Sequence, residues 1–225
     1  MIFEDDELLV VDKPAGLVVH PAPGLVEPTL AEIFGDDRAG GEDESRAGVV
    51  HRLDRGTSGL MLLARTPESH SKLQRAIERR EVERTYLALV SGSPRTKGGR
   101  IDAPIGRSPR ERHRMAVDGA GAREAVTHFE VLETIGDCSL LQVKLETGRT
   151  HQVRVHMKAI GTPIVGDTTY GGPDPYDLGR PFLHSTRLAF DHPGSGERLE
   201  LESPLPDQLM RVLQAAGGAD SVPGS

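Results

Sequence analysis

The sequence predicts an α+β fold built on a mixed, mainly antiparallel sheet with flanking helices and loops. Short β-branched segments outnumber helical ones, and several of them follow one another with no helix between. No regular strand–helix–strand repeat is present, as an all-parallel sheet would require. A chain of 225 residues is long enough to bury one sizeable core. We therefore expect a single domain over residues 1–216, followed by a disordered tail at 217–225.

The N-terminal third carries strand, helix and loop signals in turn. Residues 7–24, ELLVVDKPAGLVVHPAPG, predict two short strands around a Pro-Ala-Gly turn. A short helix is expected within 28–34, and the Gly-rich, acidic residues 35–47 predict a mobile loop. Residues 59–66, GLMLLART, predict a buried strand. Residues 67–82 predict an amphipathic helix, because a proline starts the segment and apolar residues recur four apart.

The remaining two thirds continue this mixture of strands and helices. A hairpin is expected where two alternating segments flank TIGD, and a glycine ends the first of the two later helices. The predicted strands are 83–92, 125–133, 138–146, 180–193 and 198–204, and the predicted helices are 149–161 and 206–218.

Composition argues against several classes of protein. The net charge of -7 speaks against a uniformly basic nucleic-acid coat. Cys138 is the only cysteine, so there is no internal disulfide framework, and we expect it to be a small buried residue. The N-terminus is acidic where a secretory signal would be basic, and no apolar run reaches the length of a membrane span. The sequence thus predicts a soluble, cytoplasmic protein.

Two dense polar clusters stand out. The first, VHRLDRGTSGL at 50–60, places one carboxylate between two guanidiniums and follows it with small, turn-forming residues. The second, LETGRTHQVRVH at 145–156, lies at the start of a predicted helix. Helical spacing puts Thr150 and Arg154 on one face, and it likewise puts Gln152 and His156 on a shared face. Taken alone, the second cluster is also compatible with a solvated helix face, since charged residues are mostly exposed.

No metal or cofactor site is predicted. His151 and His156 lie five apart, so a helix points them to different sides, and no cysteine or carboxylate completes a ligand set. Neither a phosphate-binding Gly-rich loop before a Lys-Ser/Thr pair nor a dinucleotide fingerprint is present.

Several motifs, taken in order, resemble the RluA-type pseudouridine synthases, which isomerise selected uridines in structured RNA. The similarity extends from about residue 2 to about residue 205 and is greatest to the ribosomal large-subunit branch. The motifs that carry it are VVDKPAGLVVHP, HRLDRGTSGL, RTYLALV, LETGRTHQVRVH, GTPIVGDTTYG and FLHSTRLAFDHP. The resemblance implies the pseudouridine synthase catalytic fold, an RNA substrate, 23S ribosomal RNA being the expected one, and no cofactor.

The resemblance also implies three catalytic roles. Asp54 matches the catalytic aspartate, and Arg154 matches its ion-pair partner, so the two clusters would meet in space. Tyr86 matches the aromatic residue that stacks on the target base, and its hydroxyl is a candidate for the proton transfer at C5. A carboxylate must be ionised to act as a nucleophile or base, and a neighbouring guanidinium favours that form. Attack at C1′ and a glycal route both remain open.

Other residues are expected to bind RNA. Arg52 matches a position near the extruded base, His51 orders its loop, and the small residues around Thr57 let the backbone turn closely. Residues 95–114 are strongly basic, which reconciles the acidic total with an RNA partner. The further candidates for RNA contact are Arg107, Arg110, Arg112, Arg114, Arg149 and His151.

Two other functions are each compatible with part of this pattern. A catalytically inactive RNA-binding module would have no reason to retain Asp54, Tyr86 and Arg154 together. A hydrolase with a nucleophilic aspartate would want a second acid or base, or a metal, and none is evident. Large-subunit members of the family often carry a small RNA-binding domain ahead of the catalytic one, whereas here the first catalytic motif follows Met1 directly.

Overall fold

The computed structural model describes residues 1–21, 24, 26–34, 48–111 and 113–218. The chain forms two compact units. Unit 1 comprises residues 1–84 and 187–203, and unit 2 comprises residues 85–186 and 204–225. The chain passes between them within strands β4 and β11 and again after Ser203.

Unit 1 contains a mainly antiparallel sheet. Its strands are β1 (Phe3–Glu4), β2 (Leu8–Lys13), β3 (Ser58–Ala64), the second half of β11 (Leu183–Asp191) and β12 (Arg198–Glu202). β2 lies between β1 and β3, with Val10 opposite Leu62, and β12 pairs with β11. Every residue of β3 is buried, as its continuous apolar run predicts.

Helix α2 (Pro67–Glu78) covers part of this sheet. Thr66 caps it by accepting a hydrogen bond from the Ser69 N–H, and Pro67 occupies the first turn, where no backbone donor is missed. Leu73 reaches the core cluster of β2, β3 and β11. The predicted strand and helix at 59–82 are therefore confirmed.

One predicted strand of unit 1 does not form. Residues 17–20 were expected to be extended partners of β2, but they are irregular. The carbonyls of Val18 and Val19 instead accept the N–H groups of Leu30 and Ala31 at the start of α1 (Leu30–Ile33). The buried Lys13 ammonium donates to the carbonyls of Pro14 and Leu17, which curls the chain away from β2. The loop predicted at 35–47 lies outside the described residues.

Unit 2 contains a second run of antiparallel strands. These are β4 (Glu83–Ser91), β10 (Cys138–Leu145), β9 (Val126–Ile135) and β5 (Gly98–Asp102), adjacent in that order. The predicted hairpin is confirmed, since β9 and β10 pair from Cys138–Ile135 to Leu145–Thr127.

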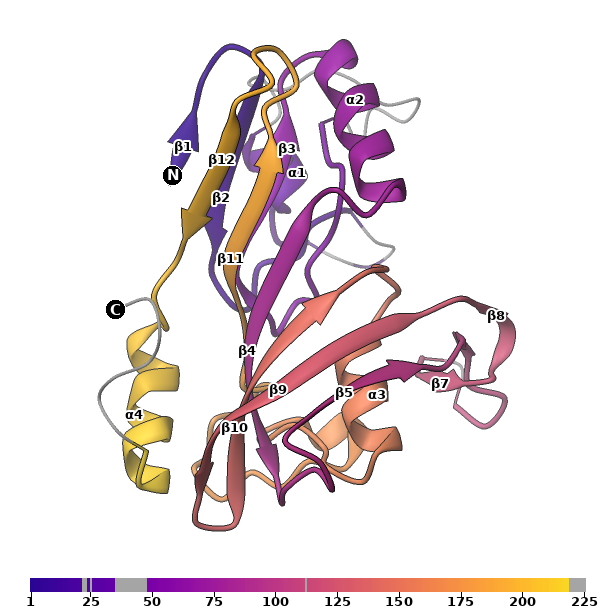
Figure 1. Cartoon of the computed structure of the whole chain (residues 1–225), viewed down its shortest axis with the longest axis vertical. Coiled ribbons are helices and arrows are strands. Elements are labelled where there is room, and N and C mark those ends of the chain that lie inside the picture. Colours follow the sequence, from indigo (N-terminus) through magenta and orange to yellow (C-terminus); the bar gives the residue numbers. More distant parts are fainter. Residues whose placement is uncertain (22–23, 25, 35–47, 112, 219–225) are drawn as a thin grey trace. The chain divides into compact units, whose positions relative to one another are not determined.

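A small separate sheet and the helices complete unit 2 (Figure 1). The sheet is formed by β6 (Ile105–Arg107), β7 (Met115–Val117) and β8 (Ala120–Arg123), with β6 in the middle. We call residues 105–123 the basic arm. The helices are α3 (Gln152–Ala159), the 3₁₀ turn η2 (Thr168–Tyr170) and α4 (Asp207–Ala216). Strands β5 to β8 were not predicted from the sequence.

The mainly antiparallel α+β fold is thus confirmed. The assignment of 1–216 to one catalytic domain stays a prediction. Gly217 ends α4 in a left-handed conformation with φ 96°, and residues 219–225 of the predicted tail lie outside the described residues.

Candidate functional site

The loop that carries Asp54 is closed by its own backbone and by a neighbouring turn. The Thr57 N–H donates to the Asp54 carbonyl at 3.0 Å, so the charged residues sit on a tight turn. Gly16 and Arg55 bond reciprocally: the Gly16 N–H donates to the Arg55 carbonyl at 2.7 Å, and Arg55 Nε donates to the Gly16 carbonyl at 3.1 Å. Arg55 therefore anchors the loop, while Asp54 itself is half-buried.

His51 is enclosed beneath this loop. Its Nε2 accepts the Leu62 N–H at 3.0 Å, so the neutral ring carries its proton on Nδ1, and Nδ1 is buried without a partner among the described residues. Burial, with the nearby charge of Arg84, lowers the pKa of His51 to about 3. The histidine is therefore uncharged at neutral pH and ties the loop to β3.

The other predicted residues of this loop differ in exposure. Arg52 lies exposed, as a residue that contacts RNA must. Thr57 is only 2% exposed, and its hydroxyl makes no hydrogen bond within the described part of the chain. Its visible contribution is the backbone N–H that closes the turn.

The second cluster opens helix α3 through a directed hydrogen-bond network. Gln152 Oε1 accepts from the Thr147 hydroxyl and the Arg149 N–H, and Gln152 Nε2 donates to the Val126 carbonyl and to Thr127 Oγ1. All of these side chains except Arg149 are buried. The network fixes the first turn of α3 against β9.

His156 extends this network one turn further. Its Nε2 lies 2.9 Å from the Ala103 carbonyl and must donate to it, so Nδ1 accepts from the Thr127 hydroxyl at 2.8 Å. Burial lowers the pKa of His156, which keeps the ring neutral. Gln152 and His156 thus share one buried helix face and one partner, Thr127.

Arg154 lies on the same helix in a buried ion pair. Its Nε is 2.7 Å from Asp167 Oδ2 and its Nη2 is 2.8 Å from Asp167 Oδ1. The Tyr170 ring lies against the guanidinium, with the Arg154 Cζ 4.9 Å from the ring centroid. Neither Asp167 nor Tyr170 was predicted as a site residue. The only sequence signal for them was their place in the GTPIVGDTTYG motif.

His151 also belongs to this group. It precedes α3 in a left-handed conformation with φ 57°, and its Nδ1 is 2.8 Å from the Tyr170 hydroxyl. The same hydroxyl accepts the Met115 N–H from the basic arm at 2.9 Å. Tyr170 therefore brings together two predicted site residues, His151 and Arg154.

The basic arm is less uniformly positive than its sequence indicates. Arg107 and Arg110 are exposed, whereas Arg114 donates to Glu111 at 2.8 Å. Arg123 adds an exposed guanidinium on β8. Arg112 lies outside the described residues.

Two further predicted residues lie in unit 2. Arg149 is half-buried and donates from Nε to the Glu124 carbonyl at 2.9 Å. Tyr86 lies in β4 and is 4% exposed. Asp54 belongs to unit 1, so its predicted pairing with Arg154 joins residues of different units and stays a prediction.

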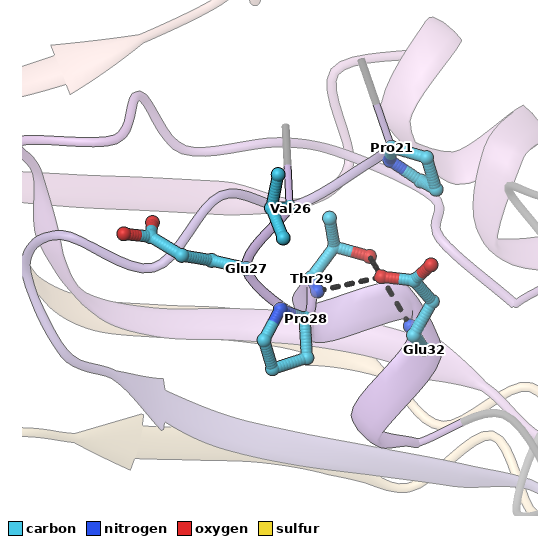
Figure 2. A pocket seen from close by; sticks show the side chains of 6 residues that line it. All are labelled: Pro21, Val26, Glu27, Pro28, Thr29 and Glu32. Atoms are coloured by element: carbon cyan, nitrogen blue, oxygen red, sulfur yellow. Dashed lines mark hydrogen bonds between the residues drawn. The ribbon is translucent and has the colours of Figure 1, made fainter. Parts of the chain in front are cut away.

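A cavity of about 260 Å³ lies in unit 1 near α1 (Figure 2). Glu32 and Glu27 are among the residues that line it, and the Glu27 carboxylate points away from the other lining side chains (Figure 2). Glu32 is engaged in a capping box with Thr29, and Glu27 pairs with Arg55 at 3.0 Å. No predicted site residue lines this cavity, and both carboxylates already have structural roles.

Residues 7–159 match the family described as RNA pseudouridylate synthase, and the chain belongs to that family. Its enzyme class is accordingly RNA pseudouridine synthase.

Relatives of known sequence and structure agree with this assignment. The chain is 48% identical over 223 residues to the ribosomal large subunit pseudouridine synthase D of Nitrosomonas europaea, covering 96% of this chain and 64% of that protein. It is 44% identical over 215 residues to a Bacillus subtilis protein named as an uncharacterized RNA pseudouridine synthase, covering 94% and 71%. The human RNA pseudouridylate synthase domain containing 4 has a similar structure, with a TM-score of 0.73, 26% identity, and coverage of 96% and 92%.

Within the part of the chain that the structure describes, no helix is long and apolar enough to cross a membrane.

Proposed function

We propose that this protein converts specific uridines of large-subunit ribosomal RNA, 23S RNA, to pseudouridine, with Asp54 as the catalytic aspartate. The observation that carries the substrate is the 48% identity to a relative named for the large ribosomal subunit. On this proposal the protein works in the cytoplasm, where ribosomal RNA is assembled with protein.

The reaction rearranges bonds without any net redox change. The bond from ribose C1′ to N1 breaks, the uracil turns, and C1′ bonds to C5, while C5 loses a proton and N1 gains one. Atoms and electrons balance within the nucleotide, so the chemistry requires no cofactor. Asp54 acts either by attack at C1′ or by removing a ribose proton on the glycal route.

Arg154 and Tyr86 complete the proposed catalytic group. Arg154 supplies the positive charge that orients the Asp54 carboxylate, and two of its five N–H donors are already directed to Asp167. Tyr86 stacks on the extruded uracil and serves the proton transfer at C5. Because Tyr86 is 4% exposed, a base can reach its ring only if the groups that cover it move when RNA binds.

RNA contact is proposed to come from arginines and histidines of both units, together with the closely turned loop at Thr57. Phosphates bind to local positive surface whatever the net charge of the chain, and arginine suits them geometrically. The proposed contacts are Arg52, His51, Thr57, Arg107, Arg110, Arg112, Arg114, Arg149 and His151.

The test is conversion of uridine in a transcribed 23S RNA by the purified protein, followed by nucleoside digestion and chromatography, since the change is silent in mass. Asp54→Asn keeps the shape but removes the charge. We expect it to lose turnover while it still folds and binds RNA. Residual activity above a few per cent, equivalent to a barrier loss of only about 2 kcal/mol, would exclude Asp54 as the catalytic residue.

A protein that binds the RNA but leaves every uridine unchanged would instead be an inactive RNA-binding module. Mapping pseudouridine in ribosomal RNA from cells with and without the gene then identifies the modified positions.

A further inference from the structure

The guanidinium of Arg154 is held on one edge and one face. On the edge, Nε donates to Asp167 Oδ2 at 2.7 Å and Nη2 donates to Asp167 Oδ1 at 2.8 Å. On the face, the Tyr170 ring centroid lies 4.9 Å from Cζ. Side-on pairing of this kind uses a different edge from end-on pairing through Nη1 and Nη2. Asp167 thus fixes the plane of the guanidinium while occupying the edge nearest the helix.

The loop that presents Asp167 leaves that carboxylate little freedom. The Asp167 N–H donates to the Ile164 carbonyl, and the Asp167 carbonyl accepts the N–H groups of Tyr170 and Gly172. A Cβ at Gly172 would lie 1.8 Å from the Ile164 oxygen, and one at Gly166 would lie 2.1 Å from the Arg180 oxygen. Only glycine fits at these two positions, so the backbone on both sides of Asp167 is set by close packing.

Tyr170 is fixed just as firmly. Its hydroxyl accepts the Met115 N–H at 2.9 Å and lies 2.8 Å from His151 Nδ1, while its side chain packs in a small core with Ile105 and Val155. The ring is therefore held from the basic arm and from the start of α3 at the same time.

A buried ion pair is a poor source of stability, since an apolar pair of similar volume often serves a fold as well or better. What the pair does provide is a guanidinium with fixed position and plane. We infer that Asp167, supported by Tyr170, is a positioning residue that fixes the plane and position of the Arg154 guanidinium for its proposed catalytic role. This inference rests on the proposed function. Both residues lie beyond residues 7–159, over which the family matches.

The experiment measures the single-turnover rate at saturating RNA, and separately the RNA Kd, on the ribosomal RNA fragment that the wild-type protein modifies. Asp167→Asn should lower the rate at least about 100-fold with the Kd within about threefold. Leu209→Ala, in the buried face of α4, is the control for lost stability, and assayed well below its melting temperature it should keep the wild-type rate.

A double-mutant cycle with Arg154→Lys separates positioning from a general loss of structure. If Asp167 acts through Arg154, the double variant should be hardly slower than the slower single variant, whereas losses that multiply would overturn the inference. Where Asp167→Asn does not fold, Asp167→Glu replaces it. That change keeps the charge but moves the carboxylate by one methylene, and an intermediate rate with unchanged Kd is expected.

A folded Asp167 variant within about threefold of the wild-type rate would show that the pair is merely structural. That outcome, with the wild-type protein active and Asp54→Asn inactive, would remove only this inference. A wild-type protein that modifies no uridine would remove the proposed function itself.

Discussion

Helix α3 and the basic arm both carry arginines in unit 2, and they hold them in opposite ways. Arg154 on α3 is enclosed between a carboxylate and an aromatic ring, whereas Arg107 and Arg110 on the arm are exposed to solvent. A fixed guanidinium can orient a reacting group, because its position is set before substrate arrives. An exposed one contributes attraction to phosphate but little precision. On the proposed function, the same residue type would thus serve the chemistry in one region and RNA affinity in the other.

The largest effect on stability and activity is expected from Arg154→Ala. The change strands the buried Asp167 carboxylate, so the free energy of unfolding should fall by about 3 kcal/mol, and activity should be lost with it. Arg154→Lys restores the charge but not the bidentate geometry, and should recover activity only in part. Arg100→Ala is the matched control, because the Arg100–Asp102 pair at 2.7 Å is exposed to solvent, so its loss should leave the thermal melt close to that of the wild type. A thermal melt of Arg154→Ala identical to that of the wild type would contradict the assigned burial.

Lowering the pH tests whether buried histidines affect the free energy of unfolding. His51 has its pKa lowered to about 3, and burial also lowers the pKa of His156. Below pH 6.5 the unfolded chain therefore takes up protons that the folded chain does not, so stability falls with falling pH. For His51 the slope is about 1.4 kcal/mol per pH unit down to its folded pKa.

Chemical denaturation between pH 7.5 and 4.5 measures this slope. His156→Gln should remove the share of the slope that His156 contributes and leave the share of His51. His113→Gln is the matched control, because the His113 side chain on the arm is 74% exposed. A stability that stays constant over this range would mean that the two buried rings are accessible to protons in the folded protein.

Removing charge from the arm should weaken RNA binding without touching the chemistry. In Arg107→Gln/Arg110→Gln, the loss of two phosphate contacts should reduce the slope of log affinity against log salt by about 1.4 to 1.8. Target and non-target RNA should be affected alike, with the single-turnover rate at saturation retained. Wild-type binding in the double variant would show that RNA follows another face.

The smallest effect is expected from Arg114→Gln. Glu111 already accepts from this guanidinium at 2.8 Å, so its charge is partly offset within the arm. The salt slope should change by less than for either exposed arginine, measured in the same titration. A change of about 0.7 to 0.9, which is the value for one full phosphate contact, would mean that RNA displaces Glu111 and recruits Arg114 fully.

The fold was predictable where the side-chain pattern follows the burial pattern. The buried strand β3, helix α2 and the β9–β10 hairpin show continuous, helical or alternating apolar residues, and all were expected. Strand β5 is mostly exposed and β8 is exposed throughout, so neither has an apolar face to reveal it. Residues 17–20 have strand composition, but their carbonyls are used by α1 instead of a neighbouring strand.

The candidate site was predictable only as far as local motifs reach. The spacing in THQVRVH placed Gln152 and His156 on one face, and the structure shows them sharing Thr127. The partner of Arg154 within unit 2 was missed, because Asp167 lies 13 residues away across a loop whose path is set by backbone packing. The pairing of Asp54 with Arg154 stays a prediction from the family resemblance.

The reciprocal bonds between Gly16 and Arg55 make one backbone amide a reporter for the loop that carries Asp54. The Gly16 N–H donates to the Arg55 carbonyl at 2.7 Å, so it can exchange with solvent deuterium only when the two turns separate. Its exchange rate therefore measures how often the loop opens, in the absence of any RNA and without a label on the aspartate. If this amide exchanges more slowly when substrate RNA is added, RNA binding closes the loop, and the measurement shows this without any assay of catalysis.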